Sequence, residues 1–183
     1  GVFLLVAGAI GARWAQRATR RRRRWGSAGV SRGFSYRESI DSPGLPGIAF
    51  RTSDYVEVGG VIDALASETP FLAGDLRGLY ASDRSTPRRV AASFVAPPPP
   101  RAVPNLVLFG TESGMLRRMG IAVENRQRLS LEGDFNRHFT LYCPSGYERD
   151  ALYIFAPDLM ALLIDAAGDC DVELVDRWMF IYS

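Results

Sequence analysis

An apolar run followed directly by a block of arginines opens the chain, and the order of these two parts constrains what can follow. Residues 1–12 are apolar or glycine, and residues 13–24 carry seven arginines without an acidic residue. A secretory signal places its basic residues before the apolar run, whereas here they follow it. A membrane-spanning helix needs about 20 apolar residues. We therefore expect residues 1–25 to be a partial transmembrane helix with a polybasic cytoplasmic flank.

The arginine block also predicts the orientation of the chain. Positive residues flanking a membrane span stay on the cytoplasmic side, so everything after the block is expected in the cytoplasm. The predicted location is the inner (plasma) membrane, with one span or more and a cytoplasmic soluble domain. Either the block only fixes this topology, or it also binds anionic lipid headgroups, each arginine contributing about 1 kcal/mol. The candidate lipid-binding residues are Arg17, Arg20, Arg21, Arg22, Arg23 and Arg24.

The distribution of charge argues against nucleic acid as a partner. The chain has 22 basic and 20 acidic residues, and its net charge of +2 hides two opposite parts. Residues 1–24 carry +7, while the remaining residues hold 15 basic against 20 acidic side chains, a net −5. A nucleic-acid-binding protein is expected to carry a basic folded domain. The folded part of this chain is mildly acidic instead.

The remaining sequence predicts a linker and one domain. Residues 26–47 are rich in Gly, Ser and Pro and are expected to be a juxtamembrane linker with at most a short helix or strand. Residues 48–183 have the length of a single cytoplasmic domain. Short apolar groups separated by turn residues predict strands from residue 48 to 80, at 90–95 and at 106–109. Residues 115–127 are ambiguous between a short helix and an extended segment.

The last third of the chain shows the clearest periodicity. In residues 139–143 the alternate side chains Phe139, Leu141 and Cys143 share one face, and residues 151–155 repeat this pattern with Leu152 and Ile154, so both segments are expected to be strands. A helix is expected from Pro157, with an apolar stripe, and Gly168 is a plausible stop. The stripe consists of Leu159, Leu162, Leu163 and Ala166.

Two further strands are expected after this helix. In the first, Val172 and Leu174 are expected to point inward, which places Asp171 and Glu173 on the solvent face. The second covers residues 178–182, where large apolar side chains occupy both alternating sets. The order ββαββ predicts an α+β fold, a single domain with a mostly antiparallel sheet preceded by the truncated transmembrane helix.

One long segment resembles a known family. The stretch 129–144 (LSLEGDFNRHFTLYCP), continued by residues 146–154 and 157–160, resembles a family of uncharacterised actinobacterial membrane proteins. It is also distantly similar to a broader bacterial family of unknown function whose ending has Thr before the helical Pro, where this chain has Ala156. The resemblance implies a short N-terminal membrane region before a soluble α+β domain. It implies no catalytic residue and no cofactor.

The single histidine defines the weak candidate for catalysis. His138 would lie near Asp134, Glu148 and Asp150 if the strands expected at 139–143 and 151–155 paired as a hairpin. Carboxylates beside an imidazole could bind a divalent cation and support hydrolysis. The same residues could equally be turn charges, neutralised by neighbouring arginines. The spacing of these residues does not define a metal site.

The two cysteines are expected to be thiols. Cys143 and Cys170 are far apart and lack the spacing of a zinc site. Cys143 is expected in the core, and the acidic neighbours of Cys170 argue against a reactive thiolate. No cofactor is predicted.

Three functions follow from these observations. The favoured hypothesis is a non-enzymatic interaction module at the inner membrane surface, with anionic lipid and an unknown protein as partners. The alternatives are a membrane-proximal metal-dependent hydrolase using His138, Asp134, Glu148 and Asp150, or a sensor of anionic lipid or of another ligand.

Overall fold

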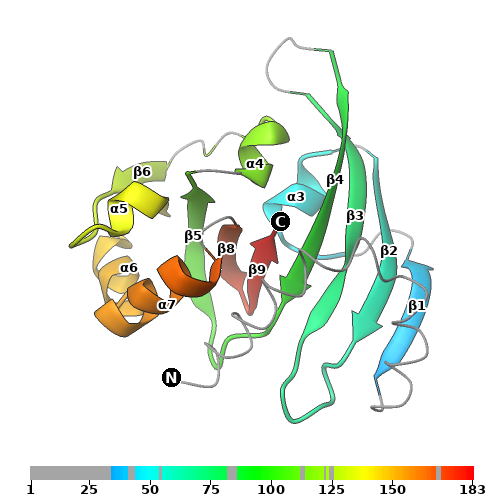
Figure 1. The fold of residues 1–183 in the computed structure, drawn as a ribbon, viewed down its shortest axis with the longest axis horizontal. Helices are drawn as coiled ribbons and strands as arrows, with labels where there is room; N and C mark the ends of the chain where they lie inside the picture. Colours follow the sequence, from blue (N-terminus) through cyan, green and yellow to red (C-terminus); the bar gives the residue numbers. More distant parts are fainter. Residues whose placement is uncertain are drawn as a thin grey trace.

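The computed structural model describes residues 34–40, 44–53, 55–81, 86–111, 114–121, 123, 126–167 and 170–183. These residues form one nine-stranded sheet in the order β1-β2-β3-β4-β9-β8-β5-β7-β6, with every neighbouring pair antiparallel (Figure 1). The expected single α+β domain with a mostly antiparallel sheet is therefore confirmed. Residues 1–33, with the expected membrane segment, lie outside the described residues. Among the residues that are described, no helix is long and apolar enough to cross a membrane.

The strands vary from four to nine residues, and most of the helices are a single turn. The strands are β1 Ser35–Ile40, β2 Val56–Asp63, β3 Leu72–Tyr80, β4 Arg88–Ala96, β5 Val103–Gly110, β6 Arg126–Leu129, β7 Phe139–Pro144, β8 Asp171–Asp176 and β9 Trp178–Tyr182. The helices are α3 Ile48–Arg51, α4 Met115–Arg118, α5 Phe135–His138, α6 Glu148–Ile154 and α7 Pro157–Ala167.

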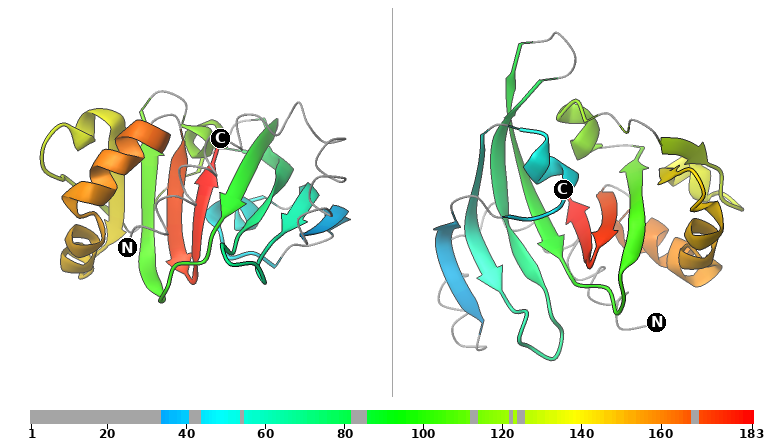
Figure 2. Two further views of the ribbon diagram at one scale, coloured as in Figure 1. Left: turned by 60° about the horizontal axis from the view of Figure 1, so that its bottom comes forward. Right: turned by 180° about the vertical axis from the view of Figure 1, so that it is seen from behind.

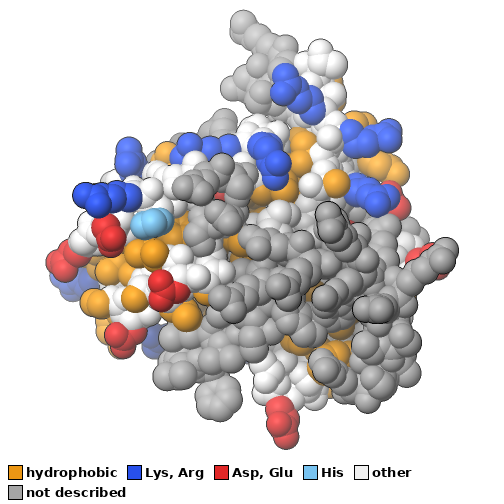
Figure 3. All heavy atoms as spheres, in the orientation of Figure 1, with side chains coloured by type: hydrophobic (Ala, Val, Ile, Leu, Met, Phe, Trp, Pro, Cys, Tyr) orange, Lys and Arg blue, Asp and Glu red, His pale blue; other side chains and the backbone are white. Residues whose placement is uncertain are grey.

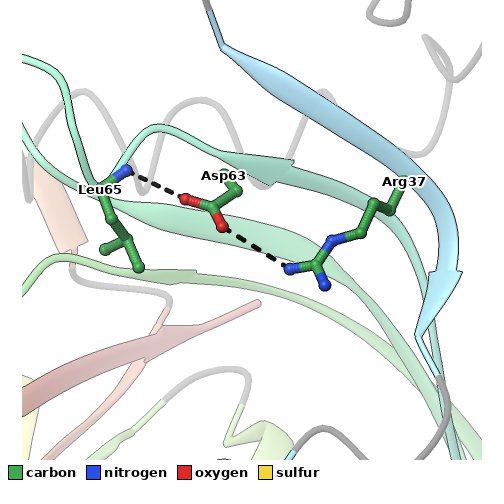
Figure 4. A network of polar contacts seen from close by, with 3 residues as sticks. All are labelled: Arg37, Asp63 and Leu65. Atoms are coloured by element: carbon green, nitrogen blue, oxygen red, sulfur yellow. Dashed lines mark hydrogen bonds and ion pairs between the residues drawn. The ribbon is translucent and has the colours of Figure 1, made fainter.

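Strand β1 lies within residues 26–47, the range expected to be a linker. It pairs with β2 in a regular antiparallel register, so this part of the range belongs to the sheet. A guanidinium nitrogen of Arg37 lies 3.6 Å from a carboxylate oxygen of Asp63, and the other Asp63 oxygen accepts a 3.1 Å hydrogen bond from the Leu65 amide (Figure 4). Both charged side chains are partly exposed, so the ion pair itself contributes little to stability.

The sheet carries two hydrophobic cores, one on each face. Helices α3 and α4 cover one face, whose core takes side chains from β2, β3, β4, β5 and β9, and helices α5, α6 and α7 cover the opposite face, whose core takes side chains from β5, β7, β8 and β9 (Figure 2). The α3 core, as we call the first, has as its largest buried members Tyr80, Phe94, Phe109, Phe180 and Tyr182. The α7 core has as its main buried members Phe135, Phe139, Leu141, Phe155 and Leu163.

The central strands contribute to both cores. In β5, Leu106 and Leu108 enter the α7 core while Val107 and Phe109 enter the α3 core. Because successive side chains of a strand point to opposite faces, such a strand must be apolar at nearly every position. Strand β9 has the same property, which explains why residues 178–182 are large and apolar throughout.

The strand expected at residues 151–155 is wrong, because this segment lies in and just after helix α6. Ala151 and Phe155 are buried four residues apart, while Leu152 is 51% exposed and Tyr153 75% exposed. Residues i and i+4 share one face of a helix, so the pattern has a helical rather than a strand period. The C-terminal order is therefore βααββ, not ββαββ.

Helix α7 begins at Pro157 as predicted, and Leu159 and Leu163 contact the α7 core. The stripe is rotated from the predicted one, since Ala167 is buried and Leu162 and Ala166 are only half-buried. Gly168, the expected stop, lies outside the described residues. The ambiguous segment 115–127 contains both helix α4 and the first residues of strand β6.

Candidate functional site

Two carboxylates on β8 are the most unusual polar groups of the described fold. Asp171 and Glu173 are both 0% exposed, so their expected place on a solvent face is wrong. Their neighbours Val172 and Leu174 point into the α7 core, and period-two alternation therefore turns the carboxylates toward the α3 core. Because both faces of β8 are covered, neither face is available to solvent.

Asp171 holds helix α4 to the sheet. One carboxylate oxygen accepts a 2.8 Å hydrogen bond from the amide of Gly110, at the end of β5, and the other accepts a 2.6 Å bond from the amide of Leu116. Burial raises the pKa of Asp171, and these two amides together with Arg117 and Arg118 oppose that rise. The side chain thus joins three separate segments at one buried point.

Glu173 holds helix α3 in the same way. Its Oε2 accepts a 2.7 Å hydrogen bond from the Ile48 amide, the first residue of α3, and a 3.0 Å bond from the Tyr182 hydroxyl. Burial, followed by the nearby Glu173 carboxylate, raises the pKa of Tyr182 well above its ordinary value. The Tyr80 hydroxyl donates a further 2.7 Å bond to the Ala49 carbonyl, and burial raises the pKa of Tyr80 to about 12.

These bonds position basic side chains at one edge of the sheet. Helix α3 ends at Arg51, and helix α4 ends with Arg117 and Arg118, all of them exposed. The guanidinium of Arg117 also lies 5.3 Å from the ring centre of Phe109. A four-residue helix has too few internal hydrogen bonds to hold its own shape, so the buried carboxylates fix where these charges stand.

The candidate catalytic residues occupy two different helices. His138 is the last residue of α5 and is half-buried, and Asp134 directly precedes that helix and is exposed. Glu148 and Asp150 belong to the first turn of α6, because the expected hairpin is replaced by a helix. The Glu148 carboxylate accepts hydrogen bonds from the Gln127 amide and from the backbone of Gly146.

No metal centre is visible in the part of the chain that the structure describes. Within that part, no group of three or more His, Cys, Asp or Glu side chains is arranged to hold a metal ion. The candidate lipid-binding arginines, Arg17 and residues 20–24, lie outside the described residues. Their role therefore stays a prediction.

Both cysteines are buried, and neither forms a disulfide among the described residues. Cys143 belongs to the α7 core as predicted, and burial raises the pKa of its thiol. Cys170 also packs in the α7 core, next to Asp171 in sequence.

The buried carboxylates had one detectable signal in the sequence. Residues 178–182 are apolar on both alternating sets, which indicates a strand covered on both faces. The strand that precedes it through the two-residue turn at Asp176 and Arg177 is then expected to be central too. Acidic residues in a central strand are buried, and buried carboxylates need hydrogen-bond donors.

The fold and the site together define an α+β sheet domain whose buried polar groups hold its helices in place. No family model and no curated protein matches the chain. Among solved structures, it is similar to the crystal structure of the mycobacterial trehalose monomycolate transport factor A, TtfA, with a TM-score of 0.59. The match covers 88% of this chain and 80% of that chain at 14% identity, so it shows a shared fold. The family resemblance of residues 129–160 stays a prediction, because no family model matches the chain.

Proposed function

We propose that the chain is a non-enzymatic accessory factor at the cytoplasmic face of the inner membrane, anchored by residues 1–25, that assists the transport of a lipid. The observation that carries this proposal is the fold likeness to a transport factor, which extends over 88% of the chain. By its printed name that protein serves trehalose monomycolate transport, so a trehalose glycolipid is the first cargo to test.

The use of the buried polar groups supports a non-enzymatic role. Asp171 and Glu173 accept hydrogen bonds from backbone amides and from Tyr182, and both are closed to solvent. A catalytic acid or base must reach the substrate directly or through a water. These two carboxylates instead hold α3 and α4 on the sheet.

Deletion of the gene in the source organism tests the proposal. We expect trehalose monomycolate, or its nearest equivalent in that organism, to accumulate at the inner membrane and to fall at the cell surface. Total synthesis of the glycolipid is expected to stay constant, because transport and not chemistry is lost. Normal surface levels in the deletion strain would contradict the proposed function.

The same deletion strain distinguishes the hypothesis of an accessory protein from that of a hydrolase. A variant with His138, Asp134, Glu148 and Asp150 all changed to Ala removes the candidate catalytic residues, of which Asp134 and Asp150 are exposed and His138 and Glu148 half-buried. We expect this variant to restore transport as well as the unchanged chain does. If it is produced folded and in equal amount but fails to restore transport, the hydrolase hypothesis replaces ours.

A further inference from the structure

The end of the β3–β4 hairpin combines exposed apolar and basic side chains. On the outer face of the sheet, Leu79 of β3 lies opposite Arg89 of β4, and the Leu79 amide donates to the Tyr55 carbonyl. Tyr55 is 61% exposed and Leu79 is 43% exposed. Arg77, in the same outward phase of β3, and Arg88, near the hairpin end, are exposed too. We call Tyr55, Arg77, Leu79, Arg88 and Arg89 the hairpin patch.

The hairpin patch forms part of a longer basic edge. The hairpin end extends beyond the body of the domain, and α3, α4 and β6 lie along the same edge (Figure 1). Arginine side chains gather along this edge in the space-filling view (Figure 3). Arg77 has an acidic residue, Glu57, opposite it on β2. Even so, within the described residues the arginines of the hairpin patch form no ion pair.

We propose that the hairpin patch is a second membrane contact, which places the β3–β4 hairpin on the headgroups of an anionic phospholipid bilayer. Guanidinium groups bind phosphate oxygens with two parallel hydrogen bonds. Tyrosine and leucine beside them can enter the boundary between headgroups and acyl chains, where an apolar body with a polar tip is favoured. This contact is distinct from the one predicted for residues 17–24.

The shape of the patch favours a bilayer over a small anion. Leu79, Arg77 and Arg89 lie on the outer face of the hairpin, and Arg88, which pairs with Tyr80, lies on its other face near the same end. These strand ends project from the domain (Figure 1), so the side chains do not surround a single point where a free phosphate could be enclosed, but they can meet an extended sheet of charge. The residues after position 24 have a net charge of −5, so an anionic membrane repels most of the domain and selects its basic edge.

The length of the chain permits both contacts at once. Strand β1 begins at the opposite end of the sheet, where Phe34 packs against Phe71 at 5.6 Å between ring centres. Strand β3, with nine residues, spans about 30 Å between the two ends. The eight residues 26–33 can span at most about 28 Å when extended. A domain lying along the membrane can therefore place the hairpin patch on the same bilayer.

The inference rests on the proposed membrane location, and its test uses the full chain. A polarity-sensitive NBD fluorophore is attached to Leu79→Cys, and a matched label to Leu65→Cys, which is 41% exposed at the other end of β3. Cys143 and Cys170 are buried, so the new cysteine is the preferred site of labelling. The labelled proteins are mixed with vesicles of phosphatidylcholine, with or without phosphatidylglycerol. Flotation reports binding of the chain, and emission reports insertion of the labelled position.

We expect label 79 to shift to the blue with phosphatidylglycerol vesicles, and label 65 to stay unchanged. Replacing Arg77, Arg88 and Arg89 by Gln is expected to lower the equilibrium constant of this contact roughly 100-fold, because the contributions of the arginines to the binding free energy add. The matched control replaces Arg101, Arg149 and Arg177 by Gln, an equal change of charge at exposed positions outside the hairpin patch. The control is expected to keep the blue shift.

Each other outcome has a definite meaning. Flotation without a blue shift at position 79, or an equal shift for both labels, overturns the hairpin contact and leaves the membrane location standing. A chain that floats with neither kind of vesicle overturns the location and the contact together. An equal shift on adding poly-glutamate without vesicles overturns the choice of a bilayer, because it shows general binding of anionic polymers.

Discussion

The two cores of this domain hold their helices by different means. On the α7 side, an eleven-residue helix packs an apolar stripe, including Leu163 and Ala167, against the sheet. On the α3 side, two four-residue helices are tied down by Asp171 and Glu173. The comparison shows two ways of holding helices on one sheet: apolar packing of a long helix, and hydrogen bonds from buried carboxylates of the sheet to two single turns.

The physical reason lies in the cost of starting a helix. One turn orders several residues for the gain of a single internal hydrogen bond, so an isolated turn is unstable. A buried carboxylate supplies acceptors for amides at the beginning of the turn, which have no partner within the helix. The α3 side therefore depends on a few polar contacts, while the α7 side depends on the sum of many apolar ones.

The largest effects are expected from removing one aromatic ring in either core. The ring centres of Phe94 and Phe50 lie 5.1 Å apart on the α3 side, and those of Phe139 and Phe135 lie 5.0 Å apart on the α7 side. We expect Phe94→Ala and Phe139→Ala each to lower the free energy of unfolding by about 3–5 kcal/mol. Chemical denaturation is expected to show one transition for both, because β5, β8 and β9 serve both cores. Two separate transitions would show that the cores unfold independently.

A smaller loss of stability is expected from Asp171→Ala, which removes hydrogen bonds on the α3 side alone. The change leaves the amides of Gly110 and Leu116 buried without an acceptor, at a cost of about 2–4 kcal/mol. Hydrogen exchange is expected to speed up at Leu116 and to stay slow at Met160 in α7. Asp171→Asn, which keeps one acceptor oxygen, should lose about half as much. Equally faster hydrogen exchange at Leu116 and Met160 would contradict a local role of Asp171 in holding α4.

A loss of about 1 kcal/mol is expected from Tyr80→Phe, because the Ala49 carbonyl then lacks its hydrogen bond. This variant also changes the response to alkali. The pKa of Tyr80 is about 12 in the fold against 10.0 ordinarily, so the native state keeps a proton that the unfolded chain releases. The stability from this difference is complete below pH 10 and is lost as the pH rises toward 12. Denaturation at several pH values should therefore show a shallower alkaline loss for Tyr80→Phe.

The smallest effect is expected on the outer surface of α6. Leu152 is 51% exposed, so Leu152→Glu should change the free energy of unfolding by less than about 0.5 kcal/mol. Its matched partner is Leu163→Ala on α7, where burial predicts a loss of about 2–4 kcal/mol. Both are measured by denaturant unfolding. A large loss for Leu152→Glu would contradict the helical period of residues 148–154.

The sequence predicts strands well where short apolar runs are bounded by turn residues. Residues 90–95, 106–109, 139–143 and 178–182 all lie in strands, and Pro157 begins a helix. The segment 151–155 misleads because it is only five residues long, with Leu152 and Ile154 two residues apart. Over so short a range, the helical spacing of Ala151 and Phe155 and the strand spacing of Leu152 and Ile154 both fit.

The site is less predictable than the fold, and Asp171 and Glu173 show why. Their alternation with Val172 and Leu174 reports only that they share a face, not that the face is covered. Whether this face is covered depends on α3 and α4, which lie more than fifty residues away in sequence and are single turns with little periodicity. The hairpin patch is likewise assembled from separate strands, and it takes the pairing of β2, β3 and β4 to bring it together.

Strand β9 has a consequence for the order of events during synthesis. It is the strand through which β4, carrying β1, β2 and β3, meets β8 in the sheet of the described residues. Until the ribosome has released residues 178–182, the nascent chain can form only two separate half-sheets. Each half exposes an open strand edge, at β4 and at β8, that invites pairing with other chains. Production from a slowly translated message should therefore yield more aggregate when translation pauses before residues 178–182 have left the ribosome than after they have left it.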